Sequence, residues 1–284
     1  MFSKALFIFG IALGFFIMVI VGFILYYGYK AKEGEQKNLL IPPQVAKIEK
    51  PPLPSVKTFV PKAKVAIVID DMGQDIKQLR ELLEINLPLS IAVLPFLPYS
   101  KDVAKEANVH GRDVLLHLPM EPKDSRNNDP GKGALFTNMS EVKVAEQVKK
   151  DIDAVPYITG INNHMGSMFT EDERLMKVVL EIAKTRNLFF LDSKTTSKSA
   201  AYRLAKDIGL RAANRQVFLD NKEDINYVKA QIQEVIEIAK KRGSAIAIGH
   251  PHPATILAIK EMFHTLNQDV DVVAVSSLID SIKE

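Results

Sequence analysis

Carboxylate, imidazole, amide and hydroxyl side chains follow short apolar runs in this 284-residue chain. They are Asp70, Asp71, His117, Asn162, Asn163, His164, Asp192, Ser193, His250 and His252. Carboxylate and imidazole groups bind zinc and similar divalent ions, and three protein ligands leave a position for water, as a catalytic site needs. The absence of cysteine excludes thiolate nucleophiles, Cys-bound zinc and iron–sulfur clusters. These residue types predict a catalytic divalent-metal site.

Each of these residues also has a simpler explanation when it is taken alone. Adjacent Asp70 and Asp71 can cap a helix or form a turn, and residues 250–253 (HPHP) can form a rigid loop. A single histidine after a strand is more often a hydrogen-bonded loop residue than a ligand. The shared position after strands favours a site, because the carboxyl ends of parallel strands meet on one face.

The apolar runs predict strands, and amphipathic segments between them predict helices. Runs of four or five apolar residues are typical of strands buried on both faces. They cover residues 65–69, 90–94, 113–116, 157–161, 188–191, 216–219, 244–248 and 271–275. The helical patterns cover residues 76–85, 141–155, 175–183 and 228–239. This alternation predicts an α/β domain with a parallel sheet, as a distorted (β/α) barrel or, alternatively, as an open doubly wound sheet.

The chain begins with an uncharged apolar segment at residues 5–29. About 20 apolar residues suffice for a helix to cross a bilayer, so we expect a transmembrane anchor. A cleaved signal peptide is the alternative, although its apolar core is usually shorter, about 7–15 residues. Three tyrosines close the segment, as is typical of a membrane interface. Gly10 and Gly14 form one small-xxx-small step, a weak sign of a homodimer.

Charge separates the rest of the chain into a linker and a domain. Residues 30–62 contain seven Lys, three Glu and six Pro, which predicts a semi-extended linker of net charge +4. Residues 63–284 carry 29 Lys and Arg against 31 Asp and Glu, a net charge of −2. Because the folded part has no basic excess, we expect no nucleic-acid partner.

Five motifs in the domain resemble the divergent polysaccharide deacetylases, distant relatives of the NodB-homology carbohydrate esterases. They are IDDMG at 69–73, HLPMEP at 117–122, NNHMGS at 162–167, LDSKTT at 191–196 and GHPHP at 249–253. They occur in the expected order, and the resemblance covers essentially all of residues 63–284. It implies a distorted (β/α) barrel of the polysaccharide-deacetylase type.

The resemblance also implies roles for individual residues. Asp70 matches the catalytic base and Asp71 the metal-binding partner of a paired-Asp motif, and His250 matches the general acid. The usual H-x-x-x-H metal motif keeps only His117, because Glu121 stands at its second position, so His164 is expected to supply the second imidazole. The usual Arg-containing motif is missing.

Substrate contacts are expected from four further residues of these motifs. They are Asn163, Asp192, Ser193 and His252. Asp192 is expected to orient His250 or to bind sugar hydroxyls, and His252 is a second candidate for either task.

Together these features predict a membrane-anchored hydrolase that uses a divalent metal to remove acetyl groups from an N-acetylated envelope glycan. Zinc is the expected metal. The bond cleaved is a carbon–nitrogen bond other than a peptide bond. The expected location is a bacterial inner or cytoplasmic membrane, with one span and an extracytoplasmic domain. The alternative is a catalytically degenerate module on the same fold that binds a glycan or a partner protein.

Overall fold

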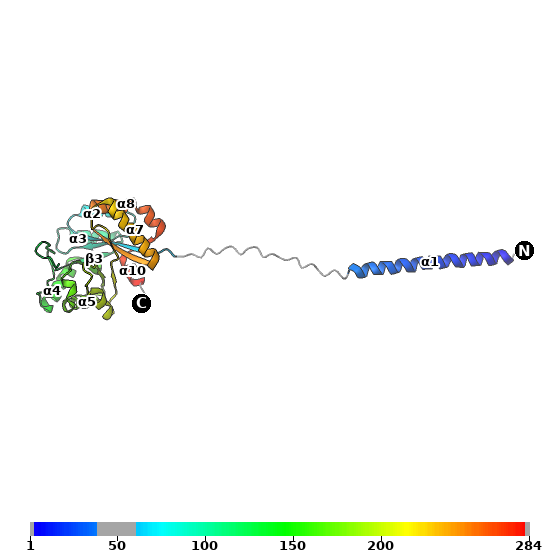
Figure 1. Cartoon of the computed structure of the whole chain (residues 1–284), viewed down its shortest axis with the longest axis horizontal. Helices are drawn as coiled ribbons and strands as arrows, with labels where there is room; N and C mark the ends of the chain where they lie inside the picture. Colours follow the sequence, from blue (N-terminus) through cyan, green and yellow to red (C-terminus); the bar gives the residue numbers. More distant parts are fainter. Residues whose placement is uncertain (1–2, 39–60, 282–284) are drawn as a thin grey trace. The chain divides into compact units, whose positions relative to one another are not determined.

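The computed structural model describes residues 3–38 and 61–281, which belong to two separate parts of the chain (Figure 1). The first part is helix α1 (Ser3–Asn38), whose stretch Gly14–Gly34 is long and apolar enough to cross a membrane. A membrane anchor and a signal sequence share these properties. Residues 30–38 of the predicted linker are helical, because α1 continues beyond the apolar segment, and residues 39–60 lie outside the described part.

The second part is an α/β domain around one curled sheet in which the strand pairs are parallel, as predicted. The strands are β1 (Lys64–Met72), β2 (Ser90–Val93), β3 (Val114–Met120), β4 (Ile158–Met165), β5 (Phe189–Asp192), β6 (Ala212–Asn214), β7 (Val217–Phe218), β8 (Ser244–Gly249) and β9 (Asp271–Val272). Their order is β6-β5-β4-β3-β2-β1-β8-β7, and β9 pairs with the start of β1. The repeated strand–helix alternation produces this topology because parallel neighbours need crossover connections.

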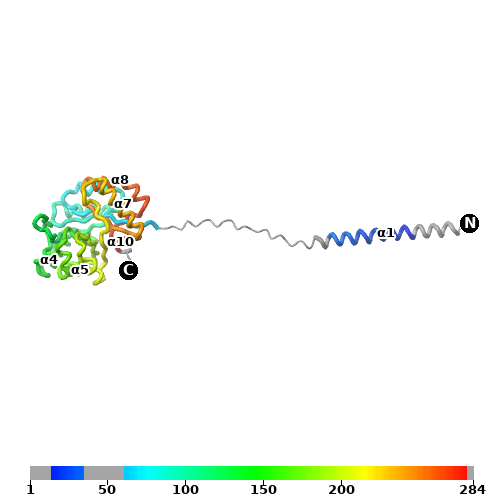
Figure 2. The backbone as a smooth tube through the Cα atoms, in the orientation of Figure 1, coloured from blue at the N-terminus to red at the C-terminus, as the bar shows by residue number. Residues whose placement is uncertain are grey.

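Helices flank the sheet, most of them on its outer face. They are α2 (Ile76–Leu83), α3 (Ser100–Val109), α4 (Glu141–Ala154), α5 (Glu173–Thr185), α6 (Ala201–Asp207), α7 (Ile225–Arg242), α8 (Pro253–Glu261), α9 (Phe263–Asp269) and α10 (Val275–Ser281), with a 3₁₀ turn η1 (Phe169–Glu171) before α5. Figure 2 shows α4 beside α5 and α7 beside α8 along the chain's outer layer. Gly243, with φ of 87°, ends α7 as its position after three basic residues predicts.

Side-chain alternation along the strands divides the core in two. In β1, Val65, Ile67 and Ile69 pack toward the helices, whereas Ala66 and Val68 face the interior of the curl. The interior cluster also contains Val275 and Leu278 of α10. The interior of the curl is therefore filled largely with apolar side chains, and a group of polar side chains lies at the carboxyl ends of the strands.

Residues 212–218, here called the closing segment, connect the two edges of the sheet. β6 pairs with β5 and β7 pairs with β8, and only Arg215 and Gln216 stand between the two short strands. Two residues are too few for the crossover that paired parallel strands require. The closing segment therefore runs on as one interrupted strand that changes partner from β5 to β8.

The structure differs from the sequence expectations mainly in where elements end. β1, β3 and β4 extend through Asp71, His117 and His164, so these residues lie within strands and not after them. The strand expected at 271–275 is only Asp271–Val272, because α10 begins at Val275. The sequence analysis named neither β6 nor the shorter helices α3, α6, α8, α9 and α10.

Candidate active site

Strand alternation decides which predicted residues face the interior of the curl. Asp70 follows Ala66 and Val68 on the inner row of β1. The same alternation puts His117, Asn162, His164 and His250 on the inner rows of β3, β4 and β8. Polar groups from four strands therefore meet above the apolar filling, as the parallel topology predicts.

Asp71, His117 and His164 form a compact cluster of potential metal ligands. Asp71 Oδ1 lies 2.8 Å from His164 Nδ1 and 3.1 Å from His117 Nε2, and the two imidazole nitrogens are 3.1 Å apart. The register of β1 is irregular between Ile69 and Met72, and Asp71 has φ of 57°. This local irregularity lets the Asp71 side chain reach the inner face of the sheet, where its neighbour Asp70 also lies. The positive φ costs backbone strain of a kind that is common at functional sites.

The cluster fits a divalent ion, because its ligand atoms converge on one point and one of them, Asp71 Oδ1, has no hydrogen bond. Asp71 Oδ1 is buried and makes no hydrogen bond of acceptable geometry, although two ring nitrogens lie close to it. His117 Nδ1 lies 3.0 Å from the side-chain oxygen Oδ1 of Asn162. Because this oxygen accepts a hydrogen bond, the proton is assigned to Nδ1, and the lone pair of Nε2 faces the cluster. Tetrahedral zinc with bonds of about 2.0–2.1 Å holds its ligand atoms about 3.3 Å apart. The three ligand atoms here, 2.8–3.1 Å apart, are close to that spacing.

The charges of the cluster are strongly coupled. Burial opposes ionisation of Asp71, but the imidazoles of His117 and His164 outweigh it and lower the pKa of this carboxyl below its ordinary value. Burial likewise opposes a charge on His117, yet Asp70 and Asp71 raise the pKa of its imidazole. Asp71 and His117 thus favour each other's charged forms.

Asp70 lies buried beside the cluster. Its Oδ1 accepts a hydrogen bond of 2.8 Å from Asn162 Nδ2, and its Oδ2 is 3.5 Å from His117 Nε2. Burial raises the pKa of Asp70 despite the opposing imidazoles of His117 and His250. Asn162 thus orients both Asp70 and His117, a role that the sequence analysis missed, although its place on the inner row of β4 indicates it.

His250 follows β8, which pairs with β1 on the side away from β2 and β3. Its Nδ1 lies 3.0 Å from Asp220 Oδ1, and its Nε2 lies 3.7 Å from Asp71 Oδ2. Asp220 Oδ2 accepts hydrogen bonds from the His250 backbone N–H and the Thr255 hydroxyl. Burial opposes protonation, but Asp220, Asp71 and Asp70 raise the pKa of His250 to about 9.

Asp220, and not the predicted Asp192, therefore orients His250. Asp192 is buried on the other face of its strand, where Oδ1 accepts from the Lys194 backbone N–H at 2.8 Å and Oδ2 accepts from the Ser199 hydroxyl at 2.8 Å. The sequence signal for Asp220 is its position directly after an apolar run, which it shares with the other site residues.

Asn163 and Ser193 organise the protein around the site. Asn163 is buried, donates to the Met165 carbonyl and accepts from the Ser193 backbone N–H. Ser193 is also buried, and its Oγ lies 3.4 Å from Asn162 Nδ2. The alternation that places Asn162 and His164 inward directs Asn163 away from them. Among the four expected substrate contacts, His252 alone has a partly exposed side chain, 3.7 Å from Glu223.

Glu121 lies apart from the ligand cluster. Its Oε2 accepts hydrogen bonds from the backbone N–H and the hydroxyl of Thr137, at 2.7 and 2.6 Å. The carboxylate thereby fastens the two ends of the loop at residues 121–137. The structure places His164, as expected, and not Glu121, beside His117.

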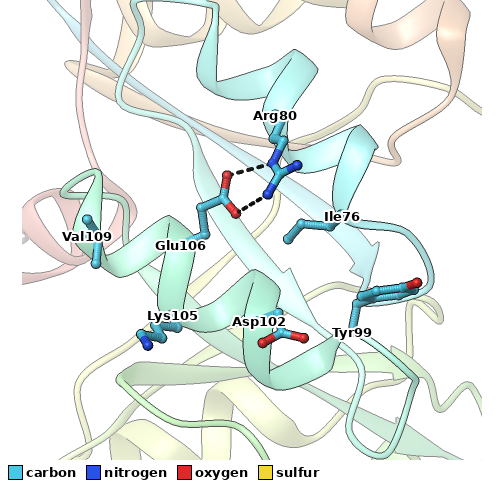
Figure 3. A pocket seen from close by; sticks show the side chains of 7 residues that line it. All are labelled: Ile76, Arg80, Tyr99, Asp102, Lys105, Glu106 and Val109. Atoms are coloured by element: carbon cyan, nitrogen blue, oxygen red, sulfur yellow. Dashed lines mark hydrogen bonds and ion pairs between the residues drawn. The ribbon is translucent and has the colours of Figure 1, made fainter.

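A separate pocket of about 440 Å³ lies between α2 and α3 (Figure 3). Arg80 and Glu106 form a bidentate salt bridge across it, and Tyr99 lies at one end. It contains none of the predicted site residues.

Parallel strands with an Asp- and His-lined carboxyl end define a polysaccharide-deacetylase-like fold, and comparison with known proteins agrees. The sequence profile described as divergent polysaccharide deacetylase matches residues 67–279. The chain belongs to this family.

Related sequences and structures extend over the same region. An uncharacterized protein of Haemophilus influenzae and the uncharacterized protein YibQ of Escherichia coli are each 37% identical over 217 residues, covering 76% of this chain and 77% and 67% of theirs. The crystal structure of an uncharacterized Agrobacterium tumefaciens protein has a TM-score of 0.73 at 21% identity, covering 78% of this chain and 91% of that one. The Bc1960 peptidoglycan N-acetylglucosamine deacetylase has a TM-score of 0.52 at 13% identity, with the same coverages. The structural likenesses show the fold.

Proposed function

We propose that this protein is a metal-dependent hydrolase that removes acetyl groups from an N-acetylated glycan of the cell envelope. The observation that carries the proposal is the buried Asp71 Oδ1, which lacks a hydrogen bond and faces two imidazole nitrogens. Membership of the family supplies the reaction class. The peptidoglycan deacetylase among the fold relatives supports the choice of an envelope glycan.

Asp71, His117 and His164 would hold the ion, and zinc suits two imidazoles with one carboxylate. When bound, a divalent ion polarises the acetyl carbonyl and lowers the pKa of water toward about 7. Asn162 keeps His117 in the tautomer that presents Nε2 to the ion.

In this proposal Asp70 is the base and His250 the acid, and they follow Ile69 and Gly249, which pair on the adjacent strands β1 and β8. Asp70 accepts a proton from the attacking water, whose oxygen bonds to the acetyl carbon while the carbon–nitrogen bond breaks. His250 donates its Nε2 proton to the leaving nitrogen, because its Nδ1 is engaged by Asp220. Acetate and a free amine result. His252 lies at the rim, where a sugar chain can contact it.

We further propose that α1 anchors the protein in the bacterial inner or cytoplasmic membrane and that the domain is extracytoplasmic. The length and composition of Gly14–Gly34 support an anchor. Reporter fusions to the carboxyl end should be active only when the reporter requires export. Release of a shortened soluble protein would instead identify a cleaved signal sequence.

The enzymatic test uses the full-length protein in detergent, with zinc and with a chelator. We expect acetate release from polymeric N-acetylglucosamine or peptidoglycan with zinc alone. Asp70→Asn and His250→Ala should each reduce the rate about 10²–10⁴-fold, whereas His264→Ala, outside the site, should not. Absence of acetate release from the zinc-loaded protein on every glycan would contradict the proposal. Tight glycan binding that survives the chelator and Asp71→Ala would favour the binding module instead.

A further inference from the structure

Arg215 occupies the turning point of the closing segment, between β6 and β7. Its backbone N–H donates to the Asp192 carbonyl at 3.0 Å. Its side chain donates from Nε to the Ser193 carbonyl at 2.6 Å and from a terminal nitrogen to the Lys194 carbonyl at 3.0 Å. One residue thus holds three consecutive carbonyl groups at the end of β5.

The same guanidinium contacts the other side of the gap in the sheet. It lies over the Phe218 ring, 5.0 Å from the ring centre, and Phe218 in turn packs against His250, with ring centres 5.3 Å apart. Phe218 belongs to β7, which pairs with β8 immediately before His250. Arg215 therefore joins the β5 edge of the sheet to the strand pair that carries His250.

The two segments that Arg215 joins each contact residues of the candidate active site. On the β5 side, Ser193 contacts Asn162, which donates to Asp70. On the β8 side, Phe218 supports the His250 ring. Arg215 is half-buried, and burial lowers the pKa of its guanidinium, although the carboxylates of Asp192 and Asp70 oppose this shift. Within the described part of the chain, no carboxylate lies at ion-pair distance from it.

We propose that Arg215 is a positioning residue that fixes, across the gap between β6 and β7, the placement of the His250 ring relative to Asn162, the residue that orients Asp70 and His117. Arginine suits this task because its planar fork donates to two neighbouring carbonyls while its face rests on an aromatic ring. Lysine has a single ammonium group and no planar face. The catalytic part of this inference rests on the proposed function, whereas the linkage of the two edges does not.

The test compares Arg215→Lys and Arg215→Ala with Arg112→Lys in the full-length protein. Arg112 is a matched control, because its side chain also donates to a backbone carbonyl, that of Ile85, away from the site. In hydrogen-exchange mass spectrometry, both Arg215 variants should exchange faster at residues 189–199 and 212–220, with α2 and α3 unchanged. Exchange that matches the wild type in Arg215→Lys and Arg215→Ala would overturn the proposal.

Kinetics and metal content separate positioning from general damage. Arg215→Lys should lower kcat about 10- to 100-fold with KM changed less than about threefold and zinc content unchanged, because a small displacement of reacting groups has effects of this size. Guanidinium added to Arg215→Ala should restore part of the rate. Loss of zinc in Arg215→Lys, or an unchanged kcat, would overturn the positioning role. If the wild type releases no acetate, the proposed function fails, and hydrogen exchange still decides whether Arg215 links the two edges.

Discussion

Asp71 and Asp151 are both carboxylates with a buried oxygen that forms no hydrogen bond, yet their surroundings differ. Asp71 faces two imidazoles, which lower the pKa of its carboxyl. Asp151, on α4, has Gln147 as its hydrogen-bond partner, and burial raises its pKa to about 7. An unpaired buried oxygen therefore indicates a ligand site only where other ligand atoms converge on it. At Asp151 the same feature accompanies a carboxyl that stays protonated in the folded state below a pH of about 7.

Replacing Asp71 is the most direct test of the proposed metal site. Asp71→Ala removes one of three ligands, so zinc affinity should fall at least about 10³-fold, and acetate release should fall with it. Zinc titration by calorimetry measures the affinity directly. Asp151→Ala is the contrasting variant, and its zinc affinity should match the wild type. Equal zinc affinity in Asp71→Ala and the wild type would contradict the metal site.

Asp151 should affect the pH dependence of the free energy of unfolding, and not zinc binding. The folded state holds its proton up to a pH of about 7, whereas the unfolded carboxyl ionises near 3.8. The unfolded state therefore releases this proton first, and stability should fall as the pH rises from about 4 to about 7, by up to about 4 kcal/mol. Asp151→Asn should remove this dependence and stabilise the domain at pH 8 more than at pH 5.

Chemical denaturation of full-length protein at the two pH values measures this difference. Asp153→Asn is the matched control, because Asp153 is exposed on the same helix and lies 3.8 Å from Arg186. Its stability curve should follow the wild type. If Asp151→Asn and the wild type change in parallel with pH, the buried carboxyl is ionised in the folded protein.

A third carboxylate, Asp220, sharpens the contrast because both of its oxygens are satisfied. Its partners are the His250 ring, the His250 backbone and Thr255. Asp220→Asn should lower acetate release about 10- to 100-fold by weakening the orientation and charge of His250, while zinc content stays unchanged. Zinc analysis of the purified variant provides the check. A loss of zinc would place Asp220 among the ligands.

The sequence predicted the parallel α/β fold because its strands are apolar runs long enough to stand out from their flanks. The sequence also predicted that five residues lie together at one end of the sheet, where the structure places them: Asp70, Asp71, His117, His164 and His250. β6 was missed because Ala212–Asn214 has neither length nor β-branched residues. The substrate roles of Asn163 and Asp192 were not supported because adjacent residues on a strand face opposite sides, and the sequence reading treated each motif as one unit.

Contacts between distant segments lay further out of reach. The orientation of His250 by Asp220 spans 30 residues, and that of Asp70 by Asn162 spans 92. Neither pair forms a local motif, so each depends on strand order and register that the sequence does not display. The closing segment has the same origin, since the exchange of partners at Arg215 depends on how the sheet curls.

The smallest expected effect concerns Glu121, which stands where the usual metal motif has histidine. Its carboxylate accepts two hydrogen bonds from Thr137, so Glu121→Gln keeps an acceptor and should change stability by only about 1 kcal/mol. Zinc affinity should stay within about threefold of the wild type, because Asp71, His117 and His164 remain. Thr137→Val, which removes one of the two donors, should have a similar small effect. A large loss of zinc in Glu121→Gln alone would mean that the carboxylate leaves Thr137 and joins the ion, and the ligand set would then include the fourth residue after His117.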